Sequence, residues 1–296
     1  MPRKNITIFF IILLFIFINT VSYVTSAGAS EKKCDRECLK GFVTQYIDAL
    51  LKQTPDALPV SKNVKFTEDC KQLKLGEGLW KSKISLTGYR RDILDVKLGT
   101  AVSFFVLKEK GSPIFFVVRL KVADNKITEI ESTVVRGKKE GMLFDPSNLK
   151  TISKGMAYVP KKEQLNSREE MIKIAMTYPE GLKVGSFVKV NSPMAPDAYR
   201  YENGQLMAGP GCTFFKGCDH MKTQMIPILS GIRYRLLAVD EKMGVVAIRM
   251  NFGPGSLFRG DGELDVWHSF KIYGGQIHSA EAFCEIVPPK TPFGWE

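Results

Sequence analysis

The sequence predicts an α+β protein made of two tandem modules, each with an N-terminal helix packed on a strongly curved antiparallel sheet. Two observations lead to this fold class. A segment with apolar residues at helical spacing precedes several short β-like runs, and the same order recurs in the second half of the chain. The last predicted strands also correspond at a constant spacing of 150 residues, with residues 125–131 matching residues 275–281. We therefore expect an internal duplication.

The first module, residues 31–160, begins with a predicted helix over residues 35–52. Its apolar residues form one stripe, which is typical of a helix that packs on a core; they are Leu39, Phe42, Val43, Tyr46, Ile47, Leu50 and Leu51. The helix is expected to end before Pro55. Strands are expected where β-like runs follow, at residues 64–67, 101–107, 114–122 and 126–135.

The second module, residues 161–296, repeats this order. Ser167 and Glu170 fit a capping box at the start of a helix, which then carries Met171, Ile172, Ile174, Ala175 and Met176. Strands are expected at residues 235–239, 245–252, 266–272 and 276–286. The boundary between the modules is expected in the polar stretch near residues 150–166.

The first thirty residues have the features of a signal peptide. Arg3 and Lys4 precede an apolar run at residues 6–18, and the small residues Ala27 and Ala29 suit signal peptidase. We expect cleavage after Ala29, which removes residues 1–29, with cleavage after Ala27 as the second choice. An uncleaved signal anchor is the alternative, but the apolar run is shorter than the ~20 residues of a spanning helix. The sequence therefore predicts a secreted, extracellular protein without a membrane segment after cleavage.

Export makes disulfides the expected state of the cysteines. Six cysteines follow the signal sequence, which are Cys34, Cys38, Cys70, Cys212, Cys218 and Cys284. We expect Cys34 or Cys38 to bond Cys70. Cys212 and Cys218 flank a short turn and can bond each other, or either can bond Cys284. As a metal site, Cys212, Cys218 and His220 lack a fourth ligand at recognisable spacing, so we expect no metal and no cofactor.

The charge of the chain is positive but spread out. It has 42 basic and 31 acidic residues, without the basic stripe and stacking aromatic residues that nucleic-acid binding needs. The Gly-Pro-Gly turns at 209–211 and 253–255 lack the Gly-Lys-Ser/Thr that follows in a phosphate-binding loop. The sequence has no Gly-x-Ser-x-Gly nucleophile elbow either. We therefore expect neither a nucleic-acid partner nor a nucleotide site.

Several motifs carry a resemblance to a known family. They are the cysteine pair at 34–38, Phe66-Thr-Glu-Asp69, Tyr201-Glu-Asn-Gly204, residues 239–245, residues 270–277, and the tail at 287–295. The mature chain resembles a family of uncharacterised secreted fungal and bacterial proteins with two nuclear-transport-factor-2-like modules. That fold also includes scytalone dehydratase, ketosteroid isomerase and SnoaL-like cyclases. The resemblance implies two tandem cones whose open ends form mostly apolar pockets with a few inward polar groups.

His268 is the strongest candidate for chemistry in such a pocket. Strand alternation places His268 with Val266 and Phe270 on one face and Trp267 on the other. General acid–base catalysis needs a carboxylate within hydrogen-bond reach of the imidazole, so Glu281 and Glu202 are the candidate catalytic partners. The alternative is that His268 is an ordinary core residue.

Two pairs of glutamates occupy matching positions in the two modules, Glu131 with Glu281 and Glu68 with Glu202. Matching positions favour an architectural role such as a salt bridge, with Arg90, Arg119 or Arg235 as the countercharge. The expected ligand-binding residues are Trp267, Phe270, Tyr201, Arg235, Glu68 and Glu131.

Two classes of function remain. In the first, one or both cones of a secreted protein bind a small apolar molecule or a partner surface. In the second, the chain is a metal-free lyase, isomerase or cyclase that acts on such a molecule. Binding is favoured because the sequence offers no His–carboxylate pair in a recognisable motif.

Overall fold

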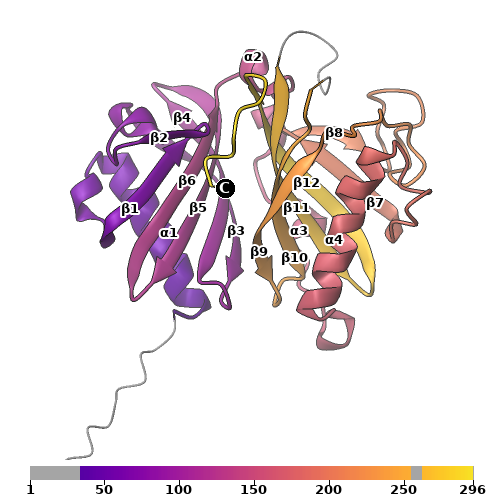
Figure 1. Ribbon diagram of the computed structural model, residues 1–296, viewed down its shortest axis with the longest axis horizontal. Helices are drawn as coiled ribbons and strands as arrows, with labels where there is room; N and C mark the ends of the chain where they lie inside the picture. The colour runs from indigo at the N-terminus through magenta and orange to yellow at the C-terminus, as the bar shows by residue number, and fades with distance from the viewer. Residues whose placement is uncertain (1–33, 255–261, 296) are drawn as a thin grey trace, which may run out of the picture. The chain divides into compact units, whose positions relative to one another are not determined.

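The computed structural model describes residues 34–254 and 262–295, and the predicted signal peptide lies outside them. Each module has one long helix and a six-stranded sheet (Figure 1). The first module contains α1 (Arg36–Lys52), β1 (Val60–Glu68), β2 (Lys71–Leu73), β3 (Ile84–Asp95), β4 (Thr100–Glu109), β5 (Ser112–Ala123) and β6 (Lys126–Val135). The second contains α4 (Arg168–Lys183), β7 (Met194–Glu202), β8 (Gln205–Ala208), β9 (Arg233–Asp240), β10 (Val245–Asn251), β11 (Glu263–Tyr273) and β12 (Gln276–Val287). The short helices α2 (Lys138–Gly141) and α3 (Lys154–Ala157) lie in the linker. None of the described helices is long and apolar enough to span a membrane.

The two sheets have the same topology. Their strand orders are β2-β1-β6-β5-β4-β3 and β8-β7-β12-β11-β10-β9. The register is also shared. Phe66 pairs with Ile130 in the first sheet, and Arg200 pairs with Ala280 in the second, where Ala280 lies 150 residues after Ile130. The predicted α+β class with two tandem modules is confirmed. The sheets are mixed rather than wholly antiparallel, since β1 is parallel to β6 and β7 is parallel to β12.

Capping residues fix the start of both long helices. The Asp35 side chain accepts a hydrogen bond from the Cys38 backbone N–H at 3.0 Å. The predicted capping box of α4 is present, with the Ser167 hydroxyl accepting from Glu170 N–H and the Glu170 carboxylate accepting from Ser167 N–H. Behind each cap, an apolar stripe packs on the concave side of its own sheet and forms a separate core for each module.

The opposite faces of the two sheets pack against each other. Phe283 of β12 contacts Phe104 and Phe115 of the first module, with ring centroids 5.2 and 4.6 Å apart. Trp267 joins this cluster and donates a hydrogen bond to the Thr133 hydroxyl at 3.0 Å. Because both faces of each sheet are covered, β10 is buried along its whole length.

A charged network lies within this interface around Arg249. The fully buried guanidinium contacts Asp265 at 2.8 Å, Glu131 at 2.6 Å and Glu285 at 3.4 Å. Glu131 belongs to the first module, whereas the other three residues belong to the second. Burial raises the pKa of Asp265 and of Glu285, and the charge of Arg249 opposes both shifts.

Other interface contacts come in reciprocal pairs. Arg36 at the start of α1 pairs with Asp240 of the second module at 2.5 Å, and Arg168 at the start of α4 pairs with Asp95 of the first at 2.6 Å. Each of these aspartates also accepts a backbone N–H from the opposite module. The two modules therefore meet through matching surfaces, as the subunits of a two-fold dimer do.

Glu131 and Glu281, which hold matching positions in the two modules, each pair with an arginine of the opposite module. Arg235 pairs with Glu131, and Arg91 lies 3.6 Å from Glu281. Arg119 also lies 3.6 Å from Glu131, so two of the three expected countercharges are confirmed. The third expectation is wrong, because Arg90 pairs with its near neighbour Asp92 at 2.9 Å.

Loss of the Arg249 charge is expected to destabilise the folded protein strongly. Arg249→Met leaves three buried carboxylates without their shared cation, and such losses cost about 3–5 kcal/mol of the free energy of unfolding. Lys97→Met is the control, because Lys97 is 60% exposed and its ion pair with Glu241 lies at the surface; we expect a change within about 1 kcal/mol. Urea unfolding followed by tryptophan fluorescence measures both, and equal stability of the two variants contradicts the assignment.

Candidate functional site

The second module encloses an apolar cavity of about 570 Å³. It opens between α4, the end of β8 and the long segment that connects β8 to β9. Its apolar lining includes Leu182, Met207, Phe215, Ile226, Leu229 and Leu264. At the mouth, Met225 is 82% exposed and Phe214 is 50% exposed, so the apolar surface continues from the cavity to the outside of the protein.

One polar group interrupts this apolar lining. The buried Arg200 guanidinium donates to the Tyr178 hydroxyl at 3.1 Å and to the Gln224 side-chain oxygen at 3.1 Å, and its Nε lies 3.2 Å from a Glu202 carboxylate oxygen. Burial raises the pKa of Tyr178 to about 12, and the charge of Arg200 opposes that shift. Burial alone lowers the pKa of Arg200. The nearby Tyr178 and Glu202 outweigh burial and raise the pKa of Arg200 above its ordinary value. The arginine is therefore a fixed cation with a matched carboxylate.

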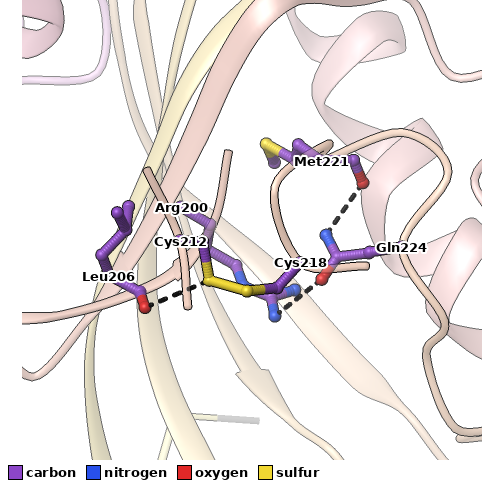
Figure 2. The surroundings of a disulfide bond; sticks show 6 residues. All are labelled: Arg200, Leu206, Cys212, Cys218, Met221 and Gln224. Carbon is purple, nitrogen blue, oxygen red and sulfur yellow. Dashed lines mark hydrogen bonds between the residues drawn. A yellow bond between two sulfur atoms is a disulfide. The ribbon is translucent and has the colours of Figure 1, made fainter. Parts of the chain in front are cut away.

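A disulfide holds the segment that covers this polar group (Figure 2). Cys212 bonds Cys218, and Cys218 accepts the Gly209 backbone N–H at 2.7 Å. Gln224 follows in the same segment and donates to the Met221 carbonyl at 2.8 Å while it accepts from Arg200. The bridge and these hydrogen bonds together fix one wall of the cavity.

The cysteine pairing differs in part from the expectation. Of the alternatives for Cys212 and Cys218, the local bridge is formed, which also removes both sulfurs as metal ligands. The expected bond from Cys34 or Cys38 to Cys70 is wrong, because Cys34 bonds Cys38 one helical turn away. Cys70 and Cys284 are buried free thiols, and the Cys70 sulfur lies 2.8 Å from Arg249 Nη2.

The first module has the same interior positions but fills them. By strand register, Phe66 stands where Arg200 stands in the second module, and Phe116 stands where Val266 does. Tyr46 of α1 contacts Trp80 and Phe116, with ring centroids 5.4 and 6.5 Å apart. Aromatic side chains thus stand in the first module at two interior positions where the second module has Arg200 and Val266.

Glu68 occupies the register position of Glu202, where Phe66 stands in place of Arg200 two residues earlier. It accepts the Leu79 backbone N–H at 3.0 Å inside the first module. Burial and the nearby Asp69 raise the pKa of Glu68 to about 7. Glu68 does not line the cavity.

His268 faces the interior of the second module, as strand alternation predicted. It is 1% exposed and packs between Phe270 and Tyr178, with ring centroids 4.5 and 4.8 Å away. Neither ring nitrogen has a hydrogen-bond partner among the described residues. The expected pairing with Glu202 or Glu281 is therefore not formed. Burial and the charge of Arg200 lower the pKa of His268 to about 3, which keeps the imidazole neutral.

The other candidates are distributed over several places. Glu202 lines the apolar cavity, whereas Tyr201 and Glu281 line a separate polar cavity. Phe270 lies in the core beside His268. Trp267, Arg235 and Glu131 lie in the interface between the sheets and line neither cavity.

Sequence reasoning missed Arg200, Tyr178 and Gln224. The signal for Arg200 was present in the duplication, because an arginine replaces Phe66 at a position that faces the interior. Tyr178 likewise occupies the same place in α4 as Tyr46 in α1, ten residues after the first residue of each helix. Gln224 lies in the segment between β8 and β9, whose path no periodic pattern predicts.

Comparisons with known proteins find a family match over part of the chain and distant structural similarities. A family model described as "Domain of unknown function (DUF8021)" matches residues 164–284, which run from α4 into β12. No curated protein matches the sequence. Among solved structures, the chain is similar to an NTF2-like protein of unknown function from Cytophaga hutchinsonii, with 14% identity, a TM-score of 0.28, and coverage of 34% of this chain and 91% of that chain. It is also similar to a candidate ketosteroid isomerase from Kribbella flavida, with 10% identity, a TM-score of 0.27, and coverage of 42% and 91%.

The burial of neutral His268 is expected to make stability depend on pH. The folded-state pKa of about 3 lies below the ordinary value of 6.5, so the unfolded chain binds a proton between these values that the folded protein does not. The stability due to neutral His268 is fully present above about pH 6.5 and is lost as the pH falls, by up to ~1.4 kcal/mol per pH unit.

The variant His268→Val tests this effect, because Val118 holds the same register position in the first module. We expect the free energy of unfolding of the wild type, relative to the variant, to decrease as the pH falls from about 6.5 to about 4. Urea unfolding at several pH values measures the difference, in which the other titrating groups cancel. A difference that does not vary with pH shows that His268 is not buried as a neutral group.

Proposed function

We propose that the second module binds a small apolar molecule that carries one polar head group. The apolar body lies in the 570 Å³ cavity, and the head group faces Arg200, Glu202 and Tyr178. One observation carries this proposal: a single buried polar group, centred on Arg200, stands in the wall of an otherwise apolar cavity.

The size and lining of the cavity suit such a ligand. Pockets for small molecules typically measure about 300–1,000 Å³ and are mostly apolar with a few polar groups that set orientation. Phe214 and Met225 at the exposed mouth extend the apolar surface outwards. Exposed apolar side chains that continue into a cavity are the expected form of an entrance for an apolar molecule.

The polar group favours a neutral head over an anion. The charge of Arg200 is already matched by Glu202 at 3.2 Å, so a second carboxylate would compete with an existing ion pair. A hydroxyl or carbonyl head can instead share the hydrogen bonds of Tyr178 and Gln224. Burying such a head without a partner would cost free energy, and this group supplies the partner.

The same geometry supports binding over acid–base chemistry. General acid–base catalysis needs a group whose pKa lies near the operating pH. The pKa of His268 is lowered to about 3, and its ring has no carboxylate partner among the described residues. Glu202 is engaged by Arg200 in an ion pair and is not within hydrogen-bond reach of the His268 ring. A lyase, isomerase or cyclase would lack its proton-transfer pair here.

We also propose that the chain acts outside the cytosol. The disulfides Cys34–Cys38 and Cys212–Cys218 support this compartment, because disulfides persist in oxidising environments. The signal peptide proposed over residues 1–29 provides the route.

Filling the cavity should abolish binding of an apolar probe. Met207 is buried and lines the cavity, so Met207→Trp places an indole in the ligand's space. The probe is 1-aminoanthracene, whose fluorescence rises in an apolar site. We expect affinity to fall about tenfold or more in Met207→Trp and to stay unchanged in Leu86→Trp, which adds the same side chain at an exposed position of the first module.

Native mass spectrometry of the purified protein complements this titration. A bound small molecule whose mass is unchanged after incubation supports binding, whereas its conversion supports an enzyme. Equal probe affinity in the wild type and in Met207→Trp places the binding site elsewhere.

A further inference from the structure

We propose that a second cavity, which shares no lining residue with the apolar one, binds a neutral sugar ring. It measures about 490 Å³ and lies between the linker around α3 and strand β7. Ser153, Tyr199, Tyr201 and Glu281 are among its lining residues. Nothing in the proposed function of the apolar cavity requires it, so it needs an explanation of its own.

A relay of hydrogen bonds forms the floor of this cavity. The Ser153 hydroxyl donates to the buried Glu281 carboxylate, and the Ser153 and Tyr199 hydroxyls lie 2.6 Å apart. Because Ser153 donates to Glu281, the Tyr199 hydroxyl donates to Ser153. The Tyr199 oxygen and the remaining lone pairs of Glu281 can then accept from a ligand. The floor therefore presents fixed acceptors to hydroxyl groups.

The charges around the cavity are balanced. Arg91 lies 3.6 Å from Glu281 and stacks on Phe104 from the first module, so the carboxylate has its countercharge on the side away from the cavity. At the rim, Lys154 and Asp197 contribute one charge of each sign. The balanced charges favour a neutral ligand over an anion or a cation, and the acceptors of the floor favour a ligand with hydroxyl groups.

Aromatic side chains supply an apolar wall to this cavity. The rings of Tyr199 and Tyr201 lie 5.5 Å apart and nearly perpendicular, with Leu206 and Pro210 beside them. The linker presses close to this wall, because a Cβ on Gly155 would collide with the Tyr199 hydroxyl. A sugar ring offers what such a site needs, since its C–H face packs on an aromatic ring while its hydroxyls reach the polar floor.

The duplication shows that a ring fits at this place in the fold. By register, Thr67 corresponds to Tyr201, and Glu131 corresponds to Glu281. In the first module, the C-terminal tail occupies this position, with the Trp295 indole donating to the Thr67 hydroxyl at 2.8 Å. The second module has the equivalent place open as a cavity.

The recognition chemistry differs between the two places. Lys65 and Arg119 face the Trp295 ring at 4.3 and 5.5 Å, as cations that attract an indole. By register, Tyr199 replaces Lys65 and Ser269 replaces Arg119 in the second module. Of these two replacements, Tyr199 lines the cavity with its hydroxyl, whereas Ser269 is buried beneath it. The two cations that favour an indole are thus missing here, which favours a polyhydroxylated ring over an aromatic peptide.

Isothermal titration of the full chain with cellobiose, maltose and N,N′-diacetylchitobiose tests this site. We expect saturable binding of at least one of the three. Tyr201→Ala should abolish it by removing the wall, and Ser153→Ala should weaken it about tenfold by breaking the relay. Met207→Trp in the apolar cavity should leave the sugar affinity unchanged, while Tyr201→Ala should leave 1-aminoanthracene binding unchanged.

Three outcomes overturn the proposal. The first is that the folded wild type binds none of the three saccharides. The second is that binding is unaffected by both Tyr201→Ala and Ser153→Ala, with folding of each variant verified by circular dichroism. The third is that a peptide of residues 287–295 binds in a Tyr201-dependent manner and displaces the sugar with higher affinity, which would assign the cavity to an aromatic peptide.

Discussion

The contact between Arg249 and Glu131 determines how the two modules can be arranged. Both side chains are fully buried, and they come from different sheets. Removing two charges from water is costly unless each has its partner in good geometry, so the arrangement is favourable only when the two sheets meet face to face. Asp265, Glu285 and Arg235 extend this constraint across the interface. Specific pairing of the modules therefore depends on polar contacts set within an apolar surface.

Once the outer faces are joined, the only interior left to each module is the concave side under its helix. The two copies use it differently. Phe66, Trp80 and Phe116 fill it in the first module, which makes that copy a packed support. In the second, the polar group around Arg200 stands in the wall of a cavity. The reciprocal contacts of the interface recur in both copies, whereas the interior positions differ between them.

Sequence reasoning recovered the parts of this structure that depend on local pattern. The spacing of 150 residues predicted the duplication, and strand alternation placed His268 inside and Trp267 outside. It missed β3. In this edge strand Leu86 is exposed and charged residues follow, so the sequence lacks a clear alternation of apolar and polar residues. It could not pair Arg249 with Glu131, 118 residues apart, or reject a bond from Cys38 to Cys70. Such pairings follow from tertiary packing, which no local pattern contains.

The difference between the two interiors can be traced to one register position. Where Phe66 stands in the first module, the neighbouring Glu68 accepts a backbone N–H from Leu79, and burial raises its pKa to about 7. Where Arg200 stands in the second, Glu202 gains a fixed cation at 3.2 Å and Tyr178 gains a donor. A buried arginine needs several acceptors, and meeting that need draws Gln224 and its disulfide-held segment over the cavity. The arginine at this register position therefore joins the polar group to the segment that encloses the cavity.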